Sequence, residues 1–245
     1  MSIRHIIKTS DKFRELNAFP DVVWTIKDVI VVLSCIFLAI VLFCLSIFSL
    51  FGANETTFNF ASYVFLILLI VVPMFWIKKR YGLNKEVLGL KKNNLSSLKI
   101  GVIGGVIAIL YHLLMRVAII EHLVTPPVIK ISYIKFILAP ISINGFPTII
   151  LAPVAEEIMF RGFIYGYLRK KLGIILGIIM QAVCFAILHL SFSFSQANAF
   201  IILLNTLSIG LIGGMLYEKT GTLYPAIICH VFINYFAFIN NVTLS

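Results

Sequence analysis

Two neighbouring glutamates, Glu156 and Glu157, lie inside the apolar run at 148–168, TIILAPVAEEIMFRGFIYGYL. A charged side chain at the centre of a bilayer costs about 2.5–3.5 kcal/mol on insertion scales. Consecutive residues of a helix point about 100° apart, so the two carboxylates face different directions. Arg161 follows Glu157 by four residues, in the order that favours an ion pair on one helix face. We therefore expect Glu157 to pair with Arg161, and Glu156, which has no local cation, to act as a general base.

Two further polar pairs occur at helical spacing in later apolar runs. Phe185 precedes His189 by four residues, and His230 precedes Asn234 by four. Taken singly, His and Asn in membrane helices commonly form hydrogen bonds between helices. Counting along each helix from the nearest basic loop, however, brings Glu156, His189 and His230 to similar depth.

The side chains of this set have complementary chemistry. A carboxylate and an imidazole can hold and deprotonate a water molecule, while a second imidazole and an amide can donate hydrogen bonds to an oxyanion. The same atoms permit another arrangement, in which Glu156, His189 and His230 bind a catalytic zinc ion. No HExxH motif supports zinc, and both mechanisms stay open from the residues alone.

The elements that position these residues are predicted to be membrane helices. The chain is 60% hydrophobic and 12% charged, whereas a soluble domain is roughly 45–50% apolar and about 25% charged. Its net charge of +10 comes from basic residues grouped between apolar runs, at 78–99 and 169–171. Such clusters mark cytoplasmic loops rather than a nucleic-acid surface, and they place the N-terminus in the cytoplasm.

The apolar runs predict an all-α, polytopic bundle of about seven to eight transmembrane helices. We expect three regions: a cytoplasmic segment at 1–28, N-terminal membrane helices at 29–132 and a catalytic membrane core at 133–245. The eighth span depends on 136–155, where several Pro and Gly residues favour a broken or re-entrant helix. Seven spans are expected at 29–51, 58–77, 98–120, 146–168, 172–190, 199–217 and 222–241.

Three motifs in order, EExxxR at 156–161, FxxxH at 185–189 and HxxxN at 230–234, resemble the CPBP family. This is the CAAX-protease and bacteriocin-processing family of intramembrane proteases. The resemblance covers roughly 146–241, and no motif position is substituted. It implies that Glu156 and His189 activate water, that His230 and Asn234 stabilise the oxyanion, and that three neighbours have supporting roles: Glu157, Arg161 and Phe185.

The resemblance implies an intramembrane endopeptidase, and the compact chain without a targeting extension favours a bacterial cell membrane. It would hydrolyse a membrane-associated substrate near the cytoplasmic side, either a lipidated CAAX-type protein or a peptide precursor. An aspartyl mechanism is excluded because no Asp follows Asp28. The alternatives are a non-catalytic immunity or scaffold protein and a transporter. A transporter is less favoured because transporters usually have a second broken helix in the other half of the sequence.

Overall fold

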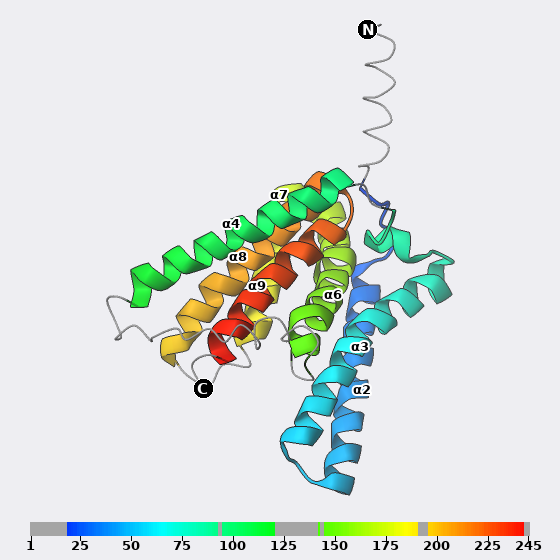
Figure 1. Cartoon of the computed structure of the whole chain (residues 1–245). Coiled ribbons are helices and arrows are strands. Elements are labelled where there is room, and N and C mark those ends of the chain that lie inside the picture. Colours follow the sequence, from blue (N-terminus) through cyan, green and yellow to red (C-terminus); the bar gives the residue numbers. More distant parts are fainter. Residues whose placement is uncertain (1–18, 93–94, 121–141, 143–144, 191–195, 243–245) are drawn as a thin grey trace, which may run out of the picture.

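The computed structural model describes residues 19–92, 95–120, 142, 145–190 and 196–242, and their regular structure is entirely helical. The predicted all-α fold is thereby confirmed. Figure 1 shows the elements. In chain order they are α2 (Ile26–Phe51), α3 (Glu55–Tyr81), the 3₁₀ helix η1 (Lys85–Leu88), α4 (Leu95–Ile120), the π-helix η3 (Pro147–Leu151), α6 (Ala152–Glu156), the π-helix η4 (Glu157–Tyr165), α7 (Gly166–Leu190), α8 (Gln196–Thr220) and α9 (Tyr224–Val242).

Four stretches of the described chain are long and apolar enough to cross a membrane: Ile26–Phe51, Glu55–Tyr81, Leu95–Leu114 and Pro147–Leu190. The last has 44 residues and reverses direction at Gly173, whose φ of 81° an L side chain rarely adopts. The predicted count of seven to eight spans is not confirmed. Residues 121–141, on which the eighth span and the predicted boundary at 132 depend, lie outside the described residues.

The segment η3, α6 and η4 occupies the middle of the molecule. In Figure 1 it lies between the α2–α3 hairpin on one side and α7, α8 and α9 on the other. It packs against α3 through α6 and η4, and against α9 through η3 and α6. Every side chain from Glu157 to Tyr165 is buried, so this segment is the core around which the other helices are placed.

Glycines allow the surrounding helices to approach closely. A Cβ atom added at Gly210 on α8 would lie 2.6 Å from the Cβ atom of Ala182 on α7. One added at Gly105 on α4 would lie 2.9 Å from the Cβ atom of Phe232 on α9. Small residues at such crossings are typical of membrane helices, where close packing replaces the hydrophobic driving force.

A buried acid joins the two helices of the hairpin. The sequence places Asp28 before the first span, and this is wrong, because α2 begins at Ile26 and Asp28 is buried in its first turn. Its Oδ1 atom accepts a hydrogen bond from Trp76 Nε1 at 3.0 Å and lies 2.9 Å from Arg80 Nε. Its Oδ2 atom accepts a hydrogen bond from the Tyr81 hydroxyl at 2.7 Å. All three partners belong to the end of α3, so Asp28 fixes the register of the hairpin.

The chain just before α2 is attached to the core rather than separate from it. The Trp24 side chain donates a hydrogen bond from Nε1 to the carbonyl oxygen of Phe163 at 3.0 Å, and its ring stacks on the Phe163 ring. Lys170 Nζ donates to the carbonyl oxygen of Val22 at 2.7 Å. These contacts anchor residues 22–24 to η4 and α7.

We expect Asp28→Asn to lower the free energy of unfolding by about 2 kcal/mol, since a hydrogen bond to a charged group contributes about 1.5–3 kcal/mol. A value in the lower half of this range applies because Arg80 is 56% exposed and solvent screens its charge. The measurement is thermal unfolding in detergent, with the exposed Asp21→Asn as the control. Equal midpoints for the two variants would show that the Asp28 contacts add nothing.

Candidate active site

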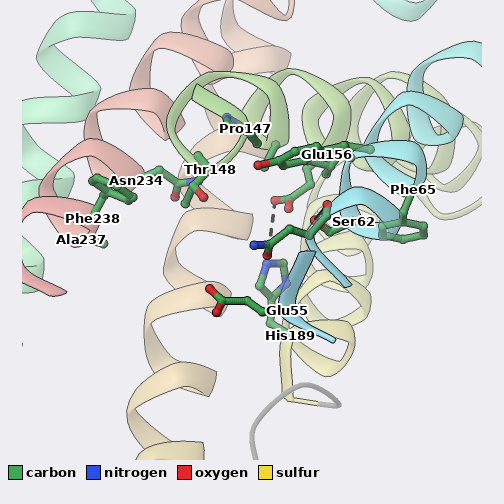
Figure 2. Close-up of a pocket in the computed structure, with 14 residues that line it drawn as sticks. Glu55, Ser62, Phe65, Pro147, Thr148, Glu156, His189, Asn234, Ala237 and Phe238 are labelled. Atoms are coloured by element: carbon green, nitrogen blue, oxygen red, sulfur yellow. Dashed lines mark hydrogen bonds and ion pairs between the residues drawn. The ribbon is translucent and has the colours of Figure 1, made fainter. Parts of the chain in front are cut away.

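A cavity of about 540 Å³ opens where four parts of the chain meet. Its wall is formed by the first half of α3, by η3 and α6, by the end of α7 and by the second half of α9. The lining includes Glu156, His189 and Asn234, three of the residues predicted from the motifs. Figure 2 shows Glu156 and His189 facing the cavity, with Asn234 beside Thr148.

Glu156 lies between two imidazoles. Its Oε2 atom is 3.8 Å from His189 Nε2 and 3.7 Å from His230 Nε2. The Glu156 and His189 side chains are 16% and 34% exposed, whereas His230 is 3% exposed. A substrate in the cavity can therefore reach Glu156 and His189, while His230 lies behind them.

The other nitrogen of each imidazole is already used, and this fixes the tautomers. His189 Nδ1 lies 2.9 Å from the carbonyl oxygen of Phe185, which can only accept, so this nitrogen carries a proton. His230 Nδ1 lies 2.9 Å from Glu157 Oε1, a carboxylate oxygen that also accepts. In the neutral form of each ring, Nε2 therefore carries a lone pair rather than a proton.

Three acceptors thus converge without a donor between them. The two Nε2 lone pairs face the same oxygen, Glu156 Oε2, which is buried and has no hydrogen-bond partner among the described residues. A buried acceptor is costly unless it is hydrogen bonded. A water molecule has two O–H donors and can therefore satisfy two of these three acceptors.

A second carboxylate, that of Glu157, holds the His230 ring in place. Glu157 Oε1 lies 3.0 Å from Arg161 Nη1, an ion pair that the i,i+4 spacing predicts. Both side chains are fully buried. The Arg161 side chain also donates from Nη2 to the carbonyl oxygen of Ile209 at 3.1 Å. Because Glu157 also accepts from His230, the ion pair and the candidate site share one network, a link that the sequence did not predict.

The Phe185 ring packs against three residues of this network. Its ring lies 4.3 Å from that of His189 and 5.9 Å from that of His230, measured between centroids. The Arg161 guanidinium carbon lies 4.6 Å from the same centroid. Phe185 therefore packs against both imidazoles, and its carbonyl orients one of them.

The comparisons with known proteins agree with this location. Residues 138–236 match the model of one protein family, described as type II CAAX prenyl endopeptidase Rce1-like. This segment is Rce1-like. The resemblance to the CAAX-protease family is thereby confirmed, and the matched residues include all seven that were predicted for the site. No curated protein and no solved structure matches the chain.

The Rce1-like segment includes the last predicted site residue, Asn234. Its side-chain Nδ2 donates a hydrogen bond to the carbonyl oxygen of Thr148 at 2.9 Å, which ties α9 to η3. The amide has a second N–H group, and Asn234 lines the cavity while His230 does not. Of the two residues predicted to stabilise an oxyanion, Asn234 is therefore the one at the cavity wall.

The cavity also has a wall that lies outside the Rce1-like segment and that the sequence interpretation missed. Glu55, Asn59, Ser62 and Leu66 of α3 all line it. Their spacing of four, three and four residues is that of one helix face. This periodicity was visible in the sequence, but three polar residues near a helix end look like an ordinary water-exposed turn.

The cavity lies away from the basic ends of the helices. It is lined by the first residues of α3 and the last of α7, whereas Lys78, Lys79 and Arg80 end α3 and Arg169 to Lys171 begin α7. The lining residues of η3 and α9 likewise lie at the ends opposite to the basic loops. The site therefore belongs to the half of the bundle that lacks basic clusters among the described residues.

The network in the Rce1-like segment predicts unequal effects of the two glutamates on stability. Glu157→Gln leaves the buried Arg161 without its carboxylate, and breaking a buried ion pair typically costs about 3–5 kcal/mol. Glu156→Gln removes a charge that has no cation and should cost less. We expect a clearly lower unfolding midpoint for Glu157→Gln in detergent. Equal midpoints would contradict this division between a supporting and a reacting carboxylate.

Proposed function

We propose that the chain is an intramembrane endopeptidase that hydrolyses a peptide bond of a membrane-associated substrate, with Glu156 as the general base. The observation that carries this proposal is the convergence of Glu156 Oε2 and two imidazole Nε2 atoms, with Glu156 and His189 lining the wall of a cavity. The match to an endopeptidase family supports protease activity in general terms. The assignment of individual roles is ours.

The reaction begins with a water molecule held by Glu156 and His189. Its O–H groups donate to the carboxylate and to His189 Nε2, which orients a lone pair toward the substrate carbonyl in the cavity. Glu156 takes one proton as the oxygen attacks the carbonyl carbon, and a tetrahedral oxyanion forms. The protonated Glu156 then donates to the leaving nitrogen as the C–N bond breaks, giving a carboxylic acid and an amine.

The oxyanion needs donors, and the second N–H group of Asn234 can supply one of them. His230 can donate to the oxyanion only if Nε2 also carries a proton, because its Nδ1–H group already donates a hydrogen bond to Glu157. Glu157, held in place by Arg161, is well placed to stabilise this positively charged imidazolium. Glu157 and Arg161 are therefore positioning residues that act through His230.

The alternative mechanism uses zinc bound by Glu156, His189 and His230. Among the described residues, no group of three His, Cys, Asp or Glu side chains is arranged to hold a metal ion. Both imidazoles do donate their second nitrogen to an oxygen, which also occurs in zinc sites. We favour the metal-free mechanism, because Asn234 is better explained as an oxyanion donor than by metal binding.

The position of the cavity bears on the side from which the substrate is reached. Basic clusters mark the cytoplasmic ends of helices, and the cavity lies at the other ends. We propose that it opens in the outer half of the membrane, rather than near the cytoplasmic side as the sequence interpretation suggested. A cysteine at Ala237, in a variant without the four native cysteines, should react with a membrane-impermeant maleimide added to intact cells. One at the exposed Lys85 should react only after lysis.

Loss of the general base tests the enzymatic role directly. We expect Glu156→Gln to lower the rate of peptide hydrolysis in detergent by at least about 100-fold, the lower end of general-base contributions. His189→Ala should also be inactive, while Glu86→Gln, a change at an exposed residue of η1, should retain wild-type activity. An immunity or scaffold protein would tolerate both of the first two variants in a complementation assay, and full activity of Glu156→Gln would refute the proposal.

The same assay separates the two mechanisms. We expect activity to persist after treatment with 1,10-phenanthroline, and metal analysis of the active protein to give much less than one zinc per chain. Loss of activity on chelation that added zinc restores would establish the zinc mechanism instead.

A further inference from the structure

The charges around the cavity are unequal. Glu55 and Glu156 both line it, whereas none of the lining residues is Lys or Arg. Arg161, a buried cation close behind this wall, is paired with Glu157. The described wall therefore presents two carboxylates, and no Lys or Arg side chain of the lining compensates their charge.

Glu55 is well placed to act on a substrate. It is the first residue of α3, where the positive end of the helix dipole favours an acidic side chain. Its side chain is exposed and has no hydrogen-bond or ion-pair partner among the described residues. Figure 2 shows Glu55 on the same side of the cavity as His189. Asn59 and Ser62 continue this polar face toward Phe65 and Leu66, which give the cavity an apolar part.

This distribution of charge discriminates between substrate chemistries. Charges in a low-dielectric cavity interact more strongly than in water. A C-terminal carboxylate three residues beyond the scissile bond would lie within roughly 11 Å of it, given about 3.3–3.6 Å per extended residue. Glu156 and Glu55 would repel such a group, whereas a Lys or Arg side chain in the same region would be attracted.

Resting on the endopeptidase function proposed above, we propose that Glu55 is a specificity-determining residue that binds a Lys or Arg side chain of the substrate. The substrate class is then an apolar peptide segment with a basic residue near the scissile bond and no free carboxylate close to it. Internal cleavage of a basic, membrane-associated peptide fits this class, and removal of a short C-terminal tripeptide does not.

The test uses the full chain in detergent and matched fluorogenic decapeptides with one apolar segment. The peptides carry Lys, Gln or Glu at each position from two to four residues on either side of the scissile bond, and they have amidated or free C-termini. At the most sensitive position we expect kcat/KM to be at least ten-fold higher for Lys than for Glu. Amidation should also raise kcat/KM when the C-terminus lies within three residues of the bond.

The variants assign this preference to one side chain. Glu55→Gln should raise KM for the Lys peptide and reduce the preference to less than three-fold. Glu55→Lys should favour the Glu peptide, and Glu55→Asp should restore part of the Lys preference. The control is Glu86→Gln, and thermal unfolding checks that each variant is folded. An undiminished Lys preference in Glu55→Gln would overturn the proposal.

Binding of uncleaved peptides separates this inference from the proposed function. The affinities of fluorescent Lys, Gln and Glu peptides are measured with Glu156→Gln and with the double variant Glu55→Gln/Glu156→Gln. A Lys preference that the second substitution removes would support the role of Glu55 even if the wild type cleaved none of the peptides. Cleavage without any charge preference would refute this role and leave the endopeptidase function intact.

Discussion

The buried ion pair between Glu157 and Arg161 is the interaction on which the rest of the site depends. Two opposite charges in the membrane interior are tolerated only when they are paired, and further hydrogen bonds to the pair lower the cost of burying it. Here the carboxylate accepts from His230, and the guanidinium donates to the Ile209 carbonyl. The pair therefore links η4 to α8 and α9. The hydrogen bond that stabilises the buried Glu157 carboxylate also orients the His230 imidazole.

This constraint explains why the two adjacent glutamates differ. Both belong to the same turn, but Glu157 points into the packed core and Glu156 points to the cavity, where only nitrogen lone pairs face its Oε2 atom. The polypeptide thus places one carboxylate beside a buried guanidinium, and the next where no Lys or Arg side chain among the described residues pairs with it. Phe185 separates these environments, since its ring packs against Arg161 and both imidazoles.

Interactions within one helix could be predicted from the sequence, and contacts between distant helices could not. The four-residue spacing of Glu157 and Arg161 predicts their ion pair, and the apolar runs predict the helices to within a few residues. The bond from His230 to Glu157 joins residues 73 positions apart, and no local pattern encodes it. The burial of Asp28 in α2 was not predicted for a similar reason. Burying a carboxylate is costly, and the partners that offset this cost lie on α3, far away in the sequence.

The α3 helix packs against α6 and η4 of the central segment, and it lies outside the Rce1-like residues. One wall of the cavity is therefore built by a helix that, among the described residues, forms no hydrogen bond or ion pair with Glu157, Arg161 or the two imidazoles. Substitutions on this face of α3 can change what the cavity accepts while the reacting groups and their supports stay as they are. In related chains, the residues that recognise the substrate and the residues that carry out the reaction can consequently change at different rates.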